Sequence, residues 1–438
     1  MLSDLTGMNA RRRRIDERPS AAMALMGVSL LFGRIVAILF VIFLAKFVVP
    51  EQYGEFRALL SIATLAAFFS DSGPVTYSAR MISSHWHDKH EVARIIDTTL
   101  FIQLIFIIIT VLILFFFGYY RLEIYILLIS MVALDYISSI LRGENKFTST
   151  SIFQVSNAII KLLLLIIVGY TLSSAMDALT ISILYSASIV PAIAILLFVE
   201  KRIPRLPRFF SYSYVKSAMK FSLPVVAMTF AHYSTINLAI PFVQAYYGSL
   251  NASYLSVAFT FGSIVAFVPS AINFVIMPTV AKEKDRIRIM KSLSYYSILT
   301  LIICGIAFIA LLIFPDLAIT ILFSSDFLPS KAYFPVVLAA FLLLALTTIF
   351  DAVWVGVGNL RVPMLTSTIG AIINIICISI SILNYTGPEG IALAFFISRL
   401  SIFILMLVIT LHKKEFLISA EMRDQEVYDL IRNQEIND

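Results

Sequence analysis

Three basic side chains lie in long apolar stretches of the sequence, far from any other charge. Arg34, Lys161 and Arg399 have no other charged residue within nine positions on either side. A cation at the middle of a lipid bilayer costs about 2.5–3.5 kcal/mol on the mildest scale, so it persists where it is paired, hydrated or used. Guanidinium and ammonium groups bind phosphates and carboxylates. We therefore expect these three residues to line a water-filled cationic lumen that binds an anionic substrate.

Three acidic residues lie in similar apolar surroundings. Asp71, Asp135 and Asp351 each stand toward the predicted cytoplasmic end of a long hydrophobic stretch. A carboxyl group in low-dielectric surroundings can exchange H⁺ or Na⁺ with the bulk solvent, so these residues are candidates for ion coupling. The alternative is a structural role, as a helix cap or as the partner of a cation, for example Arg34 with Asp71 or Asp135.

Uncharged polar residues mark two further hydrophobic stretches at roughly helical spacing. His232 and Asn237 belong to the first stretch and Asn273 to the second. Polar faces of membrane helices line cavities or hold helices together, and we expect these three side chains to line the lumen. The intrinsic pKa of histidine suits a proton relay. The alternative for His232 is a neutral, packed side chain.

Motifs for several other chemistries are missing from the sequence. No glycine is followed directly by lysine, so there is no GxxxxGK[ST] phosphate loop, which excludes an ATP-driven pump in this chain alone. The run His85–His90 has metal-ligand residue types without a companion site, and Cys304 and Cys377 form neither a disulfide framework nor a zinc pattern. We expect no enzyme, no metal site and no cofactor apart from a coupling ion, H⁺ or Na⁺.

The elements that carry these residues are predicted to be membrane helices. Hydrophobic residues make up 60% of the 438 and charged residues 14%, against about 25% charged in soluble domains. Stretches of about 20 apolar residues, the length that crosses a bilayer, recur along the chain. We predict twelve spans, at residues 22–46, 57–79, 95–117, 121–141, 151–170, 177–199, 221–246, 252–280, 293–314, 333–355, 363–383 and 391–411.

The basic residues between these spans predict the orientation of the chain. With the amino end inside, 26 of the 33 Lys and Arg residues fall in cytoplasmic segments and 4 in external ones. This asymmetry is the positive-inside pattern, and it places both termini in the cytoplasm. It also assigns the net charge of +6 to contact with anionic lipid headgroups. We therefore expect the bilayer, and no nucleic acid, as a partner.

The longest internal connection divides the chain into two halves. We predict a basic cytoplasmic N-terminus (1–21), six helices (22–199), a cytoplasmic linker (200–220), six more helices (221–411) and a cytoplasmic tail (412–438). Asp135 and Asp351 mark the ends of corresponding helices, and six helices per half give the halves one orientation. The predicted fold class is thus an all-α integral membrane protein of two six-helix bundles related by a pseudo-two-fold axis along the membrane normal, a transporter architecture.

Several short motifs resemble those of polysaccharide-exporting flippases. They are Leu44–Phe56 (LAKFVVPEQYGEF), Asp71–Pro74 (DSGP) with Arg80, Arg142-Gly143 with Lys146, and Phe221–Pro224 (FSLP). On these motifs the chain resembles the Wzx-type lipid-linked oligosaccharide flippases, which share a superfamily with multidrug extruders and lipid II flippases. The sequence departs from the family pattern at Val48-Val49, where Leu-Gly is usual.

The resemblance implies a specific transport function. Its expected substrate is an undecaprenyl-diphosphate-linked O-antigen or similar repeat unit, moved across the bacterial inner membrane, with H⁺ or Na⁺ antiport in some members. Expected partners are a polysaccharide polymerase and a chain-length regulator, and the expected state is a monomer. Two alternatives remain: a multidrug-cation antiporter of the same superfamily, and a polytopic O-antigen polymerase or glycosyltransferase.

Overall fold

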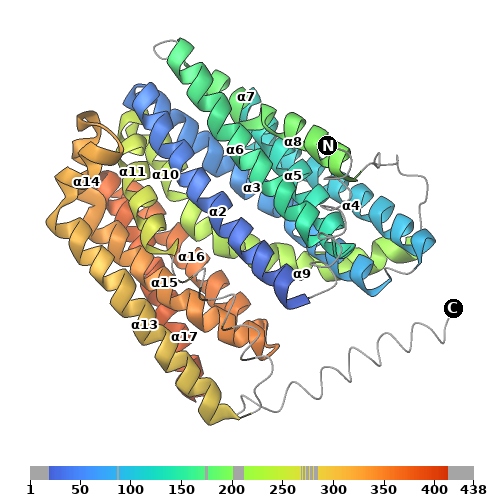
Figure 1. Cartoon of the computed structure of the whole chain (residues 1–438). Coiled ribbons are helices and arrows are strands. Elements are labelled where there is room, and N and C mark those ends of the chain that lie inside the picture. Colours follow the sequence, from blue (N-terminus) through green and yellow to red (C-terminus); the bar gives the residue numbers. More distant parts are fainter. Residues whose placement is uncertain are drawn as a thin grey trace. The chain divides into compact units, whose positions relative to one another are not determined.

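The computed structural model describes residues 19–85, 88–172, 176–200, 212–267 and 285–412, with the single residues 269, 272, 276 and 280. Within these ranges the regular elements are all helices (Figure 1). In chain order they are α2 (Pro19–Phe47), α3 (Pro50–Ser84), α4 (Lys89–Phe116), α5 (Leu122–Gly143), α6 (Phe147–Leu172), α7 (Ala178–Ala187), α8 (Ile189–Glu200), α9 (Tyr212–Asn237), α10 (Ala239–Tyr247), α11 (Ser249–Val265), α13 (Arg286–Ile313), α14 (Pro315–Leu322), the 3₁₀ helix η2 (Ser325–Tyr333), α15 (Phe334–Gly356), α16 (Arg361–Leu383) and α17 (Gly387–His412).

These helices confirm the predicted all-α membrane fold. Ten spans of the described chain are long and apolar enough to cross a bilayer, and α9 with α10 makes an eleventh if this bent pair counts as one span. The remaining predicted span, 252–280, begins in α11 and extends into residues that are largely outside the described ranges. The predicted N-terminus, linker and tail also lie wholly or mostly outside them, so the predicted domain boundaries stay a prediction.

Helix α3 begins earlier than its predicted span. The segment Tyr53–Phe56, predicted to connect the first two membrane helices, forms part of the first two turns of a 35-residue helix that starts at Pro50. Proline suits the first turn of a helix because its missing N–H has no partner there, and Glu51 adds a favourable charge at the helix N-terminus. The hydropathy of the sequence therefore identified the membrane-crossing part of α3 but not the start of the helix.

The chain forms two compact units. Unit 1 comprises Met1–Ser256 with Ile319–Pro329, and unit 2 comprises Val257–Ala318 with Ser330–Asp438. In unit 1, α3 packs against α4, α5, α7, α9 and α10, while α2 packs on α6. The apolar part of α3 is 72% buried, so α3 is the central helix of unit 1.

Small residues make this central position possible. The buried side of α3 is rich in alanine, serine and glycine, which let helix backbones approach closely in a membrane. A Cβ atom at Gly54 would lie 1.9 Å from the Ser249 carbonyl oxygen, and one at Gly73 would lie 2.7 Å from the Ser222 carbonyl oxygen. The glycines of two motifs are therefore the points where α3 touches α11 and α9.

A cluster of charged residues holds the N-terminal end of α3, near Gly54. Arg121, in the connection before α5, binds Glu55 of α3 through Nη1 at 2.6 Å and Glu123 of α5 through Nη2 at 2.5 Å. The hydrogen bonds that Arg121 donates to Glu123 and Glu55 hold the pKa of Arg121 above its ordinary value. The glutamate of the Tyr53–Phe56 segment thus joins α3 to α5.

Two of the membrane spans are broken near a proline. Helix α9 ends at Asn237 and α10 continues at an angle of 46°; Pro241 cannot donate a hydrogen bond to the Asn237 carbonyl four residues earlier. The span Ala178–Glu200 is interrupted at Ser188, between α7 and α8, and Pro191 stands in the same relation to Ala187. Both breaks place polar side chains, Asn237 and Ser188, inside a membrane span.

Unit 2 is built around α15 and α17. Helix α15 packs on α13 and α17, and α16 packs on α17. Their shared core contains Trp354, which is 2% exposed and donates from Nε1 to the Thr410 hydroxyl at 3.1 Å. A buried indole N–H needs such a partner. This core positions the polar residues of α15 and α17 described below.

Candidate functional site

The structure brings two of the predicted acids together in unit 1. Asp71 of α3 and Asp135 of α5 lie close to each other, and their carboxyl groups interact electrostatically. Asp71 is 3% exposed, and its Oδ2 atom is buried without a hydrogen-bond partner. Two carboxylates so close to each other repel when both are ionised, and a proton on one of them removes this repulsion. The pair is therefore a natural place to hold one proton.

A basic residue lies near this acid pair. Arg142, at the end of α5, acts electrostatically on both Asp71 and Asp135, and its Nε donates to the Ser138 carbonyl at 3.2 Å. From sequence we counted Arg142 as a cytoplasmic loop charge. Its position seven residues after Asp135 puts both side chains on one face of a helix, a signal that would have revealed the contact.

An aromatic pair lies beside the acids. Tyr233 of α9 stacks on Phe68 of α3 with ring centroids 3.6 Å apart. Its hydroxyl is within electrostatic reach of Arg34, Asp135 and Asp71. Tyr233 therefore connects the acid pair with Arg34, the predicted lumen cation of α2. The sequence did not single out Tyr233, because an aromatic residue in an apolar helix carries no distinguishing pattern.

Arg34 is the most open of the predicted cations. Its side chain is exposed although it lies within the apolar span Met26–Phe47. A Cβ atom at the neighbouring Gly33 would meet no atom within 4 Å. An exposed guanidinium inside a membrane span is costly against lipid, which favours a hydrated surrounding. This environment suits the predicted role of Arg34 in binding an anionic substrate.

The predicted polar cavity residues lie on the broken span. The His232 and Tyr233 rings contact edge to face at 5.2 Å. Asn237, at the bend, donates from Nδ2 to the Tyr233 carbonyl at 3.1 Å. These two residues thus flank the stacked tyrosine, whereas Asn273 lies outside the described residues. Their role in lining a lumen stays a prediction.

Asp351 and Arg399 form a separate charged pair in unit 2. Arg399 of α17 is fully buried (0% exposed), with its Cζ 5.5 Å from the Phe395 ring centroid. It interacts electrostatically with Asp351 of α15, whose Oδ1 is buried without a hydrogen-bond partner. A fully buried cation that interacts with a partly buried carboxylate fits the structural role that the sequence left open as an alternative.

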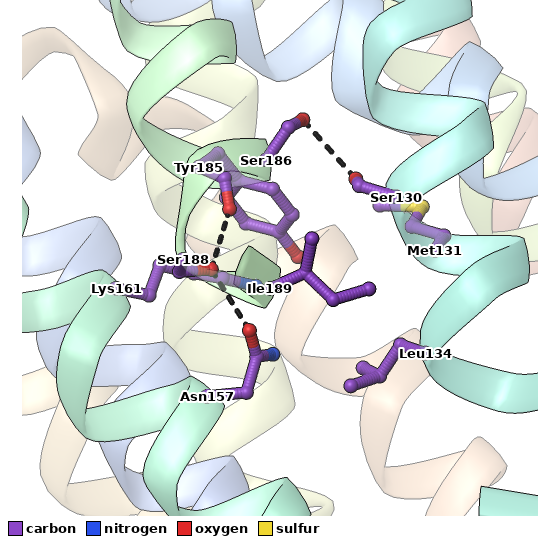
Figure 2. Close-up of a pocket in the computed structure, with 9 residues that line it drawn as sticks. All are labelled: Ser130, Met131, Leu134, Asn157, Lys161, Tyr185, Ser186, Ser188 and Ile189. Atoms are coloured by element: carbon purple, nitrogen blue, oxygen red, sulfur yellow. Dashed lines mark hydrogen bonds between the residues drawn. The ribbon is translucent and has the colours of Figure 1, made fainter. Parts of the chain in front are cut away.

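Lys161 occupies a third environment. It lies on α6 and faces a small pocket between α5, α6 and the broken span α7–α8 in unit 1 (Figure 2). Arg34, Lys161 and Arg399 thus have three different kinds of surroundings, of which only that of Arg34 is open. Within the ranges that the structure describes, no group of three or more His, Cys, Asp or Glu side chains could hold a metal ion.

Comparison with known proteins gives a family and a fold. Residues 22–284 match the model of a family described as polysaccharide biosynthesis protein. No curated protein matches the chain. The lipid II flippase MurJ, in an inward closed conformation, is 18% identical with a TM-score of 0.65, over 88% of this chain and 87% of that one.

Two further solved structures are similar over most of their length. An outward-facing MATE multidrug resistance transporter of the MOP superfamily is 15% identical, with a TM-score of 0.62, over 93% of this chain and 98% of that one. A MOP superfamily transporter from Pyrococcus furiosus, described by the reverse polarity of its binding pocket, is 16% identical, with a TM-score of 0.56. The similarity covers 90% of this chain and 95% of that one. These likenesses show the fold of these membrane transporters.

Proposed function

The chain belongs to the polysaccharide biosynthesis protein family, and we propose that it is a flippase for an undecaprenyl-diphosphate-linked oligosaccharide. Its cargo would be an O-antigen or similar repeat unit of a surface polysaccharide. The flippase would move this unit from the cytoplasmic to the outer leaflet of a bacterial inner membrane. The family match carries the proposal, and it includes the acid pair, Arg34 and Lys161. The similarity of fold to a lipid II flippase supports transport of a lipid-linked substrate.

The proposed transport follows an alternating-access cycle. The diphosphate and sugars would enter a hydrated cleft from the cytoplasm while the lipid tail stays in the bilayer. Arg34 supports this step, because its exposed guanidinium offers the charge that a diphosphate or acidic sugar needs. We place the basic segments and both termini in the cytoplasm, and expect a polymerase and a chain-length regulator to take up the product outside.

Arg34→Ala is expected to lower glycan export by about tenfold to a hundredfold, the loss that follows from removing one charge-assisted hydrogen bond of about 1.5–3 kcal/mol. The measurement is the amount of surface polysaccharide at equal protein level. Arg94→Ala is the matched control, because Arg94 is half-exposed and pairs with Glu91 within the first turns of α4. Equal export by wild type and Arg34→Ala would exclude a substrate contact at Arg34.

We further propose that the Asp71–Asp135 pair couples transport to protons. The groups that face the pair from the neighbouring helices are Arg142 of α5 and Tyr233 of α9. Release of the shared proton would leave two adjacent carboxylates, a repulsive state that only a rearrangement of α3 against α5 or the approach of a cation can relieve. Uptake and release of one proton can thereby alternate two conformations of the helices.

Asp71→Asn is expected to remove the dependence of the transport rate on a transmembrane pH gradient, because an amide cannot release a proton. The measurement is substrate translocation in vesicles with an imposed gradient. Asp316→Asn serves as the control, since Asp316 is exposed and paired with Lys331. The proposal would be contradicted if transport by Asp71→Asn still depended on the pH gradient. It would also be contradicted if wild-type transport depended on a sodium gradient and not on a pH gradient.

Depletion of the protein in cells tests the function itself. We expect the lipid-linked repeat unit to accumulate unpolymerised on the cytoplasmic leaflet while the surface polysaccharide is lost. A multidrug-cation antiporter would instead leave the polysaccharide intact and change the accumulation of cationic dyes. A polymerase or glycosyltransferase would leave repeat units on the outer leaflet, or unfinished ones on the inner leaflet. Either of these results would overturn the flippase proposal.

A further inference from the structure

A small polar pocket lies inside unit 1, at the break between α7 and α8. It has a volume of about 30 Å³, and a cavity of about 10–15 Å³ already holds one water molecule. Polar side chains from three elements surround it: Ser130 of α5, Asn157 and Lys161 of α6, and Ser186 and Ser188 at the end of α7 (Figure 2). The pocket therefore has room for about two water molecules or for one small ion.

The Lys161 ammonium group is fixed at one wall of this pocket. Its Nζ lies 3.4 Å from the centroid of the Tyr185 ring, a close cation–π contact. The ring is held in turn by Phe40 at 5.5 Å and Phe56 at 6.2 Å. Three aromatic rings from α2, α3 and α7 thus set the position of this one cation.

The positive charge of Lys161 has no carboxylate to balance it. Among the residues that the structure describes, no acidic side chain forms an ion pair with Lys161 within 4.0 Å, whereas Lys146 of the same chain segment binds Glu144 and Glu200. The face of an aromatic ring offsets part of the cost of a cation in a membrane but leaves its net charge. A bound anion would neutralise it.

The serine hydroxyls of the pocket donate their hydrogens to protein oxygens, so the donors left for a ligand are the Lys161 ammonium and the Asn157 amide. The hydroxyl of Ser130 donates to the Leu127 carbonyl at 2.8 Å, and that of Ser186 donates to the Ile126 carbonyl at 3.3 Å. The third hydroxyl, of Ser188, is shared between the Tyr185 carbonyl at 2.8 Å and Asn157 Oδ1 at 2.9 Å. This last bond orients the amide of Asn157, which is 5% exposed, and leaves its N–H₂ group for a ligand.

We propose that this pocket binds one monatomic anion of the size of chloride, held by Lys161 Nζ and Asn157 Nδ2. The volume excludes a phosphate-bearing headgroup with its sugars, so the site is distinct from any site for the lipid-linked substrate. Its anion neutralises Lys161 and ties α6 to the break at Ser188. The site belongs to unit 1 alone and does not depend on the proposed transport function.

A chloride titration of the purified protein tests this site. Replacing gluconate by chloride at constant ionic strength is expected to raise the thermal unfolding midpoint of the wild type, because a ligand that binds only the folded state stabilises it. Lys161→Met keeps the length of the side chain, removes the charge, and is expected to weaken the apparent chloride affinity at least about tenfold. Asn157→Ala should weaken it several-fold.

Lys331→Met is the matched control, because Lys331 is half-exposed and already paired with Asp316 at 3.0 Å. It should keep the chloride response of the wild type. A wild type without chloride response would mean that the pocket holds only water, and an equal response in Lys161→Met would place the anion elsewhere. Both results would overturn the proposal.

Bromide substitution gives a second readout that needs no variant. Crystals of the wild type grown or soaked in bromide should show an anomalous peak beside Lys161 Nζ and Asn157. This measurement keeps the proposal testable if Lys161→Met does not fold. Bromide peaks that lie only elsewhere on the protein, and none in this pocket, would contradict the assignment.

Discussion

Replacing Gly54 by alanine is expected to abolish the accumulation of folded protein. The added Cβ atom would lie 1.9 Å from the Ser249 carbonyl oxygen and 2.7 Å from the Ser253 backbone nitrogen. Both obstacles are backbone atoms of the α11 helix, which cannot move aside as a flexible side chain would. Overpacking by a methyl group costs about 1–3 kcal/mol where neighbours can relax, and we expect more than about 3 kcal/mol here.

Thermal unfolding and gel filtration of detergent-solubilised protein measure this effect. Gly305→Ala is the control, because a Cβ atom at that helical glycine meets nothing within 4 Å and alanine favours a helix by about 1 kcal/mol over glycine. We expect Gly305→Ala to be as stable as the wild type or slightly more stable. A Gly54→Ala protein that folds and unfolds like the wild type would refute the close packing of α3 on α11.

Replacing Arg399 by methionine is expected to destabilise unit 2 by about 3–5 kcal/mol, the cost of removing one of two opposite charges that interact inside the protein. Asp351→Val should cost a similar amount, because it leaves the fully buried Arg399. The double variant Arg399→Met/Asp351→Val should recover most of the loss, since apolar residues of similar volume often replace a buried pair without penalty.

The reactivity of Cys304 reports on the unfolding of unit 2, because this thiol is 1% exposed in the folded protein. Cys377 is partly exposed, so the measurement is made with serine at that position in every variant. If the stability losses of the two single variants add up in the double variant, Asp351 and Arg399 do not interact. An Arg399→Met protein of unchanged stability but defective in export would support the alternative, a substrate-binding role.

The membrane spans were predictable because the bilayer sets their length and hydropathy. The residues that form contacts between the spans were harder to predict. Asp71 and Asp135 stand 64 residues apart in the sequence, and nothing local indicates that α3 packs beside α5. The sequence suggested Arg34 as the partner of these acids, and the structure adds Arg142, whose helical spacing to Asp135 carries the signal.

The three predicted lumen cations also show that the sequence does not reveal contacts between helices. Sequence patterning treated Arg34, Lys161 and Arg399 alike, because each is a lone charge in an apolar stretch. Their surroundings differ only through residues from other helices: Tyr233 near Arg34, Tyr185 under Lys161 and Asp351 near Arg399. A lone basic residue in an apolar stretch thus has three different surroundings, from which we propose a substrate contact for Arg34, an anion site for Lys161 and a buried charge interaction for Arg399.

The broken spans account for the remaining differences from the predicted helices. A proline in a hydrophobic stretch indicates a bend but not which polar groups the bend presents. At Pro241 the bend presents Asn237 beside Tyr233, and at Pro191 it presents Ser188 to Asn157. The positions of Asn237 and Ser188 therefore depend on a local break in the helix.

Translocation by the purified protein tests the central claim most directly. Liposomes that contain the protein and an undecaprenyl-diphosphate-linked oligosaccharide are treated with a membrane-impermeant reagent that modifies sugars on the outer leaflet. We predict that the protein makes the inner-leaflet pool accessible, and that Arg34→Ala slows this exchange while Arg94→Ala does not. The contradicting result is that the folded protein moves a cationic dye across the liposome membrane while the oligosaccharide on the inner leaflet stays inaccessible to the reagent.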